Sequence, residues 1–241
     1  SLYSFTEGAA DQGMPNITSG DENVAIGDEA LKANTSGSNN TAVGDEALKA
    51  NSTGIKNTAV GKNSLYSNTS GQQNIGIGFE ALRNNTTGGY NTAVGVEANR
   101  SNTSGILNTS VGYEALETNT SGSHNTALGA RAMKNNSGSY NTAVGSESLD
   151  ASGSGSYNTA VGSSSLSANT TGSNNTAHGS YSLNRNTTGS DNTATGRNSL
   201  YFNTTGSSNT AQGAFALYSN TSGSYNTAIG QSSLRSNLTG S

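Results

Sequence analysis

Hydrophobic and polar positions recur along the chain with a period of 17 residues. Each period contains a stretch such as NTAVG at 40–44, in which a β-branched residue, a small residue and usually valine or isoleucine precede a glycine. Such alternation predicts a short strand with one face restricted to small side chains. The asparagine before each strand is separated from the next by 17 residues, or by 16 from Asn125 to Asn141. This column consists of Asn23, Asn40, Asn57, Asn74, Asn91, Asn108, Asn125, Asn141, Asn158, Asn175, Asn192, Asn209 and Asn226.

One large apolar residue follows the glycine of each strand by four positions, and only Asn99 interrupts this column. A single large side chain per period predicts a thin core filled by a ladder of stacked residues. An aspartate in this ladder would be a buried charge without a partner, so we expect it to destabilise the fold. The core ladder consists of Leu31, Leu48, Leu65, Leu82, Leu116, Met133, Leu149, Leu166, Leu183, Leu200, Leu217 and Leu234.

A second glycine recurs in every period, as at Gly37 and Gly54. Two glycines at fixed phase indicate two corners that need positive φ or close backbone approach, and they leave no room for a stable helix. The sequence therefore predicts an all-β fold, a parallel β-solenoid of thirteen 17-residue coils over 23–241, with the asparagine columns forming hydrogen-bonded ladders. Residues 1–22, which contain the only proline, are expected to form an irregular junction or partial cap. The one-residue deletion near Asn135 and the turn at 151–156 predict a locally bent or looser stack.

The composition argues against several classes of function. Only 30% of the 241 residues are hydrophobic, which suits a repeat that stacks on itself better than an ordinary globular core. The net charge of −4 and the scattered lysines and arginines argue against a nucleic-acid partner, and no apolar run is long enough for membrane insertion. The chain contains no cysteine, and no signal peptide is expected at its start. We expect both ends to be open coils, either cut from a longer array or stacking end to end into a filament.

The repeated NTAVGxxAL unit resembles the head repeats of YadA-like trimeric autotransporter adhesins, and similar units occur in phage tail fibres. The resemblance covers about residues 23–241, although the 17-residue period and the added NTSG turn depart from the family's shorter coils. It implies a left-handed β-roll, a homotrimer about a common axis, and an extracellular, cell-surface or virion-fibre location. An adhesive rod of this kind could contact glycans or a host surface.

Catalysis, cofactors and bound metals are not expected. The two histidines, His124 and His178, lie about three coils apart, and no nucleophile, phosphate or zinc motif accompanies them. A glutamate column (Glu29, Glu46, Glu80, Glu97, Glu114 and Glu147) could offer oxygen ligands to calcium, but a solvated face balanced by Lys32, Lys49, Arg83 and Arg100 is the favoured interpretation. Tyrosines also share columns, for which cross-coil packing is favoured over sugar binding.

Glycosylation sequons recur in the turns. In a secreted eukaryotic protein they would predict one glycan per coil, whereas in a bacterial protein the same residues would only form the turn. The candidate acceptors are Asn34, Asn51, Asn68, Asn85, Asn102, Asn119, Asn169, Asn186, Asn203, Asn220 and Asn237.

The third strand position is apolar in most coils but polar in three successive ones. A closed thin core would not accept three polar residues in a row, so this column is predicted to meet a partner chain or water. The candidate assembly face includes Val43, Val60, Ile77, Val94, His178, Thr195 and Gln212. The leading prediction is a non-enzymatic structural protein of an extracellular fibre or adhesive rod, assembling as a homotrimer or a head-to-tail filament and possibly decorated with glycans. The alternative is an ice-binding solenoid, suggested by the regular threonines.

Overall fold

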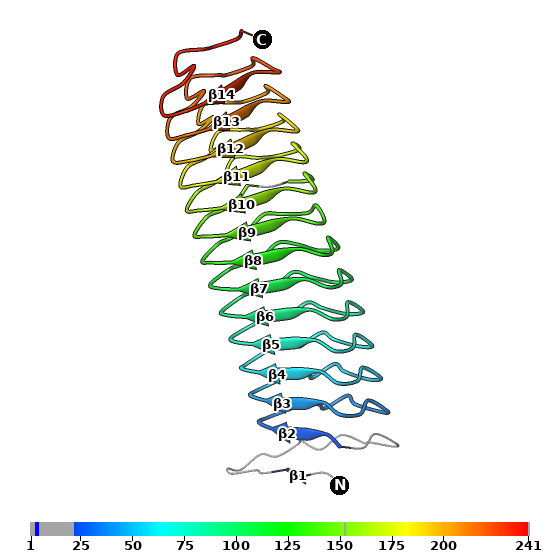
Figure 1. Ribbon diagram of the computed structural model, residues 1–241. Helices are drawn as coiled ribbons and strands as arrows, with labels where there is room; N and C mark the ends of the chain where they lie inside the picture. The colour runs from blue at the N-terminus through cyan, green and yellow to red at the C-terminus, as the bar shows by residue number, and fades with distance from the viewer. Residues whose placement is uncertain (1–2, 5–21, 152, 241) are drawn as a thin grey trace. The chain divides into compact units, whose positions relative to one another are not determined.

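The computed structural model describes residues 3–4, 22–151 and 153–240. The predicted junction at 1–22 lies mostly outside these residues. The chain divides into two compact units, Ser1–Ser123 and His124–Ser241. Each is a stack of coils with parallel strands, and the described residues contain no helix, hence none long and apolar enough to cross a membrane (Figure 1). The predicted fold class, a parallel β-solenoid with a 17-residue repeat, is confirmed.

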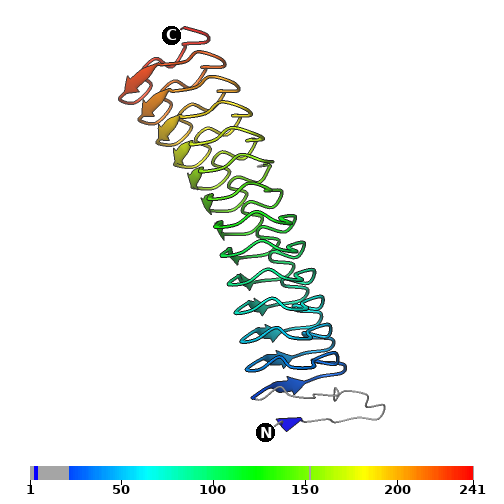
Figure 2. The ribbon, with the colours of Figure 1, turned by 90° about the vertical axis from the view of Figure 1, so that its right-hand side faces the viewer.

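Strands pair in sequence order within each unit. The N-terminal unit contains β1 (Tyr3–Ser4), β2 (Val24–Ile26), β3 (Thr41–Val43), β4 (Thr58–Val60), β5 (Ile75–Ile77), β6 (Thr92–Val94) and β7 (Thr109–Val111). The C-terminal unit contains β8 (Thr126–Leu128), β9 (Thr142–Val144), β10 (Thr159–Val161), β11 (Thr176–His178), β12 (Thr193–Thr195), β13 (Thr210–Gln212) and β14 (Thr227–Ile229). Strands line one side of each stack and turns the other (Figure 2).

In each strand from β2 to β14 the middle residue points inward and the two outer residues point outward, as a strand of period two requires. Small inward residues such as Ala42 and Ala59 bring the sheet close to the core ladder. Eleven ladder residues, from Leu31 to Leu217, are fully buried. Leu234 is 51% exposed, because no coil of the described chain follows to cover it.

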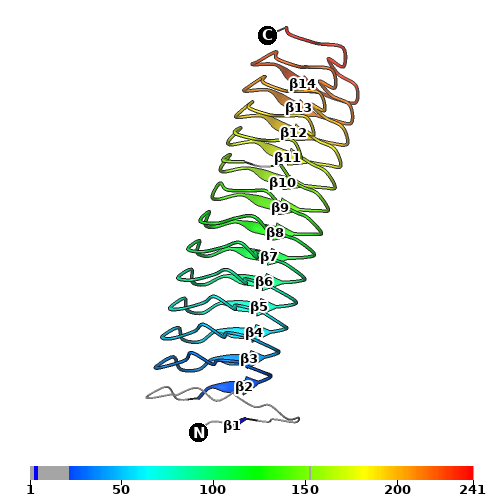
Figure 3. The ribbon, with the colours of Figure 1, turned by 180° about the vertical axis from the view of Figure 1, so that it is seen from behind.

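The segments between strands stack as regularly as the strands do (Figure 3). Their backbone N–H groups donate to the next coil, as from Leu48 N to Ser64 O (3.0 Å) and from Thr35 N to Ser52 O (3.0 Å). Hydrogen bonds between coils thus extend well beyond the three-residue strands, which explains how so little strand sustains the stack.

The two glycines of a coil serve different purposes. Gly61, at the end of β4, has φ +128°, a conformation that L side chains rarely adopt. Gly71 lacks positive φ but allows close approach, since a Cβ there would lie 2.3 Å from Oδ1 of Asn68 and 2.4 Å from the carbonyl oxygen of Gly88.

Positive φ also occurs at non-glycine residues, which the sequence did not predict. In the coil that begins with β4, Asn63, Leu65 and Gln73 have φ values of 57°, 52° and 55°. The same positions repeat in the other coils, with leucine or methionine in most core positions. Each such residue costs roughly 1 kcal/mol, so stacking must offset a conformational penalty in every coil.

The deletion near Asn135 does not interrupt the sheet. Strands β8, β9 and β10 pair in continuous parallel register on both sides of it. The turn absorbs the missing residue, since Asn136 Nδ2 donates to the carbonyl oxygen two residues ahead, at Gly138 (3.0 Å), where other turn asparagines reach three residues ahead.

Candidate functional site

The outer sheet face is the surface that each unit forms with the first and third residues of its strands, β2 to β7 in one unit and β8 to β14 in the other. Its first column is threonine in most coils, and its third column is mainly valine or isoleucine. None of these residues is Asp, Glu, Lys or Arg. Within each unit, the outer sheet face is therefore a regular, uncharged surface with one mainly hydroxyl-bearing column beside one mainly apolar column.

The candidate assembly residues all lie on this face. Val60 and Ile77 are exposed, while Val43 and Val94 are half-buried between neighbouring coils. His178, Thr195 and Gln212 stand in register on β11, β12 and β13, and none of them enters the core. The polar residues of this column face outward, so the sequence argument that they meet water or a partner chain is compatible with the structure.

Two asparagine ladders support the face from inside the coil. Strand asparagines join successive coils: Asn57 accepts from the backbone N of Asn74 at Oδ1 (2.9 Å), and its Nδ2 donates to Gly71 O (2.8 Å). Turn asparagines form the second ladder, in which Asn68 Nδ2 donates to Asn51 Oδ1 (2.8 Å). Because these amides are buried and hydrogen-bonded, they fix the register and spacing of adjacent coils.

The candidate glycosylation acceptors are the asparagines of the second ladder. Ten of the eleven candidate acceptors are buried, Asn34, Asn51, Asn68, Asn85, Asn102, Asn119, Asn169, Asn186, Asn203 and Asn220, and only Asn237 is partly exposed. The Nδ2 of Asn68 donates to both Asn51 Oδ1 and Gly71 O, so a glycan on this nitrogen would displace one of two buried hydrogen bonds. The burial of these ten amides in the folded stack therefore gives no support to glycosylation at these positions.

No family model matches the chain, and no curated protein or solved structure is similar to it.

The glutamate column is largely balanced by cations in the N-terminal unit. Lys49 bridges Glu29 and Glu46, Lys32 pairs with Glu29, and Arg100 Nε lies 2.6 Å from Glu80 Oε2. Hydrogen bonds donated by Lys32 and then Lys49 hold the pKa of the Glu29 carboxyl below its ordinary value, and those that Lys49 donates to Glu29 and Glu46 raise the pKa of Lys49. These contacts match the predicted solvated face with alternating charge.

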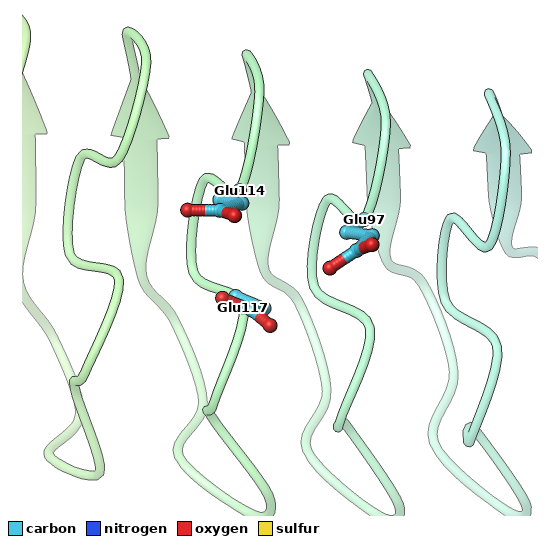
Figure 4. Close-up of side chains that lie close together, drawn as sticks. All are labelled: Glu97, Glu114 and Glu117. Carbon is cyan, nitrogen blue, oxygen red and sulfur yellow. The ribbon is translucent and has the colours of Figure 1, made fainter.

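Three carboxylates gather further along the same unit. Oxygens of Glu97, Glu114 and Glu117 lie within 4.8 Å of one another on neighbouring coils (Figure 4). All three are half-buried, and Glu114 and Glu117 have other interactions as well. Oxygen clusters of this kind suit hard cations, and acidic surface groups also gather without any ion.

Aromatic columns in the C-terminal unit stack as predicted for cross-coil packing. The ring of Tyr140 lies between those of His124 and Tyr157, with centroid distances of 4.6 and 4.9 Å and nearly parallel planes. Tyr201 and Tyr218 stack at 5.4 Å. These contacts stabilise adjacent coils.

Sequence reasoning missed three arginines that the fold brings beside aromatic rings, Arg185, Arg197 and Arg235. They look scattered along the chain, being 12 and 38 residues apart. Their phase within the repeat was the signal that could have found them, since arginines and rings fall within the same six residues after a strand glycine in consecutive coils.

Proposed function

We propose that the chain is a non-enzymatic structural repeat protein of an extracellular fibre or adhesive rod, whose copies associate through the outer sheet face. The observation that carries the proposal is the complete lack of charged residues on this face, in a chain where Asp, Glu, Lys and Arg are otherwise distributed over the coils. Interface cores are depleted in charge and contain apolar side chains. The third column of the face supplies exposed or half-buried apolar side chains in every coil except those of β11, β12 and β13.

The resemblance of the NTAVGxxAL unit to trimeric adhesin heads favours a homotrimer, and a cell-surface or virion-fibre location. Rigidity supports a structural role, because paired strands, two asparagine ladders and the core ladder all repeat from coil to coil. A surface that is already ordered loses little entropy on association.

The test is the mass of the protein in solution by sedimentation equilibrium at micromolar concentration. We expect the wild type to be oligomeric, with the trimer as the favoured species. The variant Val60→Glu/Val161→Glu, which buries one charge per unit on association, is expected to be monomeric. The matched control Thr87→Glu/Thr171→Glu puts the same charges on exposed turn residues and should remain oligomeric. A monomeric wild type, or equal behaviour of the two variants, contradicts the proposal.

Ice binding is a second candidate, and one observation favours it. In each unit most strands begin with an outward threonine, at strand spacing of about 4.8 Å, and most carry an outward apolar residue two positions later. The turn threonines do not add to this array, because hydroxyls such as Thr69 Oγ1 donate to the next coil, here to Thr86 O (3.1 Å).

Thermal hysteresis distinguishes the two candidates. An ice-binding face would produce hysteresis in the monomer, and Thr159→Lys would abolish it by placing a charged side chain on the flat surface. A structural fibre would produce no hysteresis in either protein. Clear activity at micromolar concentration would refute the purely structural proposal.

A further inference from the structure

We propose that the C-terminal unit binds an acidic polysaccharide through an arginine–aromatic patch carried by the coils of β11 to β14 (Figure 1). The arginines of the patch are Arg185, Arg197 and Arg235, and its rings are those of Tyr201, Phe202, Phe215 and Tyr218. The patch belongs to the segment that follows the strand glycine, not to the outer sheet face, so this proposal stands independently of the one above.

Each guanidinium of the patch lies against an aromatic ring. The Cζ of Arg185 is 4.9 Å from the ring centroid of Phe202, and that of Arg197 is 4.9 Å from Phe215. Arg235 is 5.2 Å from Phe215 and 5.5 Å from Tyr218. Rings within about 6 Å of a cation attract it through the quadrupole, so the guanidinium groups are held in place before any ligand arrives.

The three arginines differ from those elsewhere in the chain. Arg83, Arg100 and Arg131 pair with glutamates, whereas no carboxylate of the described residues pairs with Arg185, Arg197 or Arg235. The sequence after residue 150 contains three arginines and one acid, Asp191, in a protein whose net charge is −4. Positive charge therefore remains uncompensated at this patch and is available to an external anion.

The geometry specifies the anion further. Stacking over a ring leaves the N–H edge of a guanidinium exposed, and this edge binds carboxylate or sulfate with two parallel hydrogen bonds. All three arginines are exposed while the rings beneath are half-buried. Arg185 and Arg235 are three coils apart, about 14 Å at about 4.8 Å per coil, so an extended polymer with spaced anionic groups fits better than a single small ion.

The arginine–aromatic patch suits a sugar polymer better than single-stranded nucleic acid. Nucleobases bind such proteins by stacking on open aromatic faces along a continuous basic groove. Here Tyr201 and Tyr218 stack on each other and the arginines cover the other rings. Away from the patch the surrounding residues are mostly serine, threonine and asparagine, which hydrogen-bond sugar hydroxyls and add no positive charge.

The test measures binding of the full chain to polygalacturonate, with neutral dextran and a thymidine oligonucleotide as comparisons. We expect polygalacturonate to bind and to be released by salt, because exposed ion pairs are screened. Dextran is expected not to bind. The variant Arg185→Gln/Arg197→Gln/Arg235→Gln should bind polygalacturonate about tenfold or more weakly, from three exposed pairs each worth a few-fold.

The matched control is Arg83→Gln/Arg100→Gln/Arg131→Gln, which removes three arginines that already have carboxylate partners and should bind like the wild type. A triple lysine variant at the patch retains the charge without the planar fork and should bind several-fold more weakly than the wild type. Circular dichroism checks that each variant is folded. The proposal is overturned by undetectable polygalacturonate binding, by equal loss in patch and control variants, by full affinity of the lysine variant, or by tighter binding of the oligonucleotide.

Discussion

At the residue scale, the coil depends on hydrogen bonds between buried asparagine side chains, and Asn99 does not take part in them. It occupies a core-ladder position, is fully buried, and neither its Oδ1 nor its Nδ2 has a hydrogen-bond partner. An unsatisfied buried amide costs about 1–3 kcal/mol. The positive φ of 48° at this position suits asparagine better than leucine, although leucine adopts the same conformation in neighbouring coils, as at Leu82 and Leu116.

Asn99→Leu is therefore expected to stabilise the N-terminal unit by about 1–3 kcal/mol, since leucine burial and removal of the orphan amide outweigh the conformational cost. Chemical denaturation measures the change. Asn102→Leu is the control, because Asn102 Nδ2 donates to Asn85 Oδ1 (2.7 Å) and to Gly105 O (3.1 Å), and its loss should destabilise the unit. A decrease in stability for Asn99→Leu would show that the buried amide is satisfied in solution.

A second prediction at this scale concerns the turn glycine. Gly71→Ala would place a methyl group 2.4 Å from the carbonyl oxygen of Gly88, which belongs to the next coil and cannot move without breaking its own bonds. We expect a loss of about 3 kcal/mol, comparable to overpacking a core, measured by thermal unfolding. Ser70→Ala, at the exposed neighbouring residue, should change little. Equal effects of the two substitutions would contradict the close packing of the turns.

At the element scale, the ion pairs between coils give the N-terminal unit a defined dependence on pH. The pKa of Glu29 is lowered, so its contribution to stability is present above its ordinary value of 4.5 and is lost as the pH falls. The pKa of Lys49 is raised, so its contribution is present below 10.5 and is lost only at higher pH. Stability from this cluster is therefore complete at neutral pH.

Lys49→Met is expected to lower the melting temperature at neutral pH, because it leaves Glu46 without its partner and Glu29 with Lys32 alone. The difference from the wild type should shrink as the pH falls from about 4.5, the ordinary value for Glu29, through the lowered pKa of its carboxyl. Lys56→Met removes an exposed lysine without a recorded ion pair and serves as the control. A difference that is independent of pH would assign the effect to the lysine stem, not to its charge.

The elements also show what the sequence could predict. Columns of Asn40, Ala42, Gly44 and Leu48 determined the strand, its inward face and the core ladder, because each residue type repeats at a position where only its size or hydrogen bonding is compatible with stacking. The left-handed conformation of Leu48 could not be predicted, since leucine has no preference for it and only the closure of the coil imposes it. The burial of the turn asparagines was likewise hidden, because sequons carry no information about which side of a turn the amide faces.

At the scale of the whole molecule, the two proposals concern different faces of the coil. The outer sheet face carries no charge, and the segment after the strand glycine carries nearly all the ion pairs and the arginine–aromatic patch. The third column of the outer sheet face is apolar except at His178, Thr195 and Gln212, which occupy paired positions on β11, β12 and β13. If copies of the chain associate through this face, these residues weaken it locally.

The variant His178→Val/Thr195→Val/Gln212→Val extends the apolar column across those three strands without altering the core. We expect association to tighten, because three further apolar side chains leave water at the interface, each worth about 1 kcal/mol or more, and sedimentation equilibrium measures the shift. The control Thr188→Val/Thr205→Val/Ser222→Val adds apolar groups at exposed turn positions and should leave association unchanged. Unchanged association in the first variant would mean that the outer sheet face is solvated in the assembled state, and equal tightening in both would indicate nonspecific aggregation.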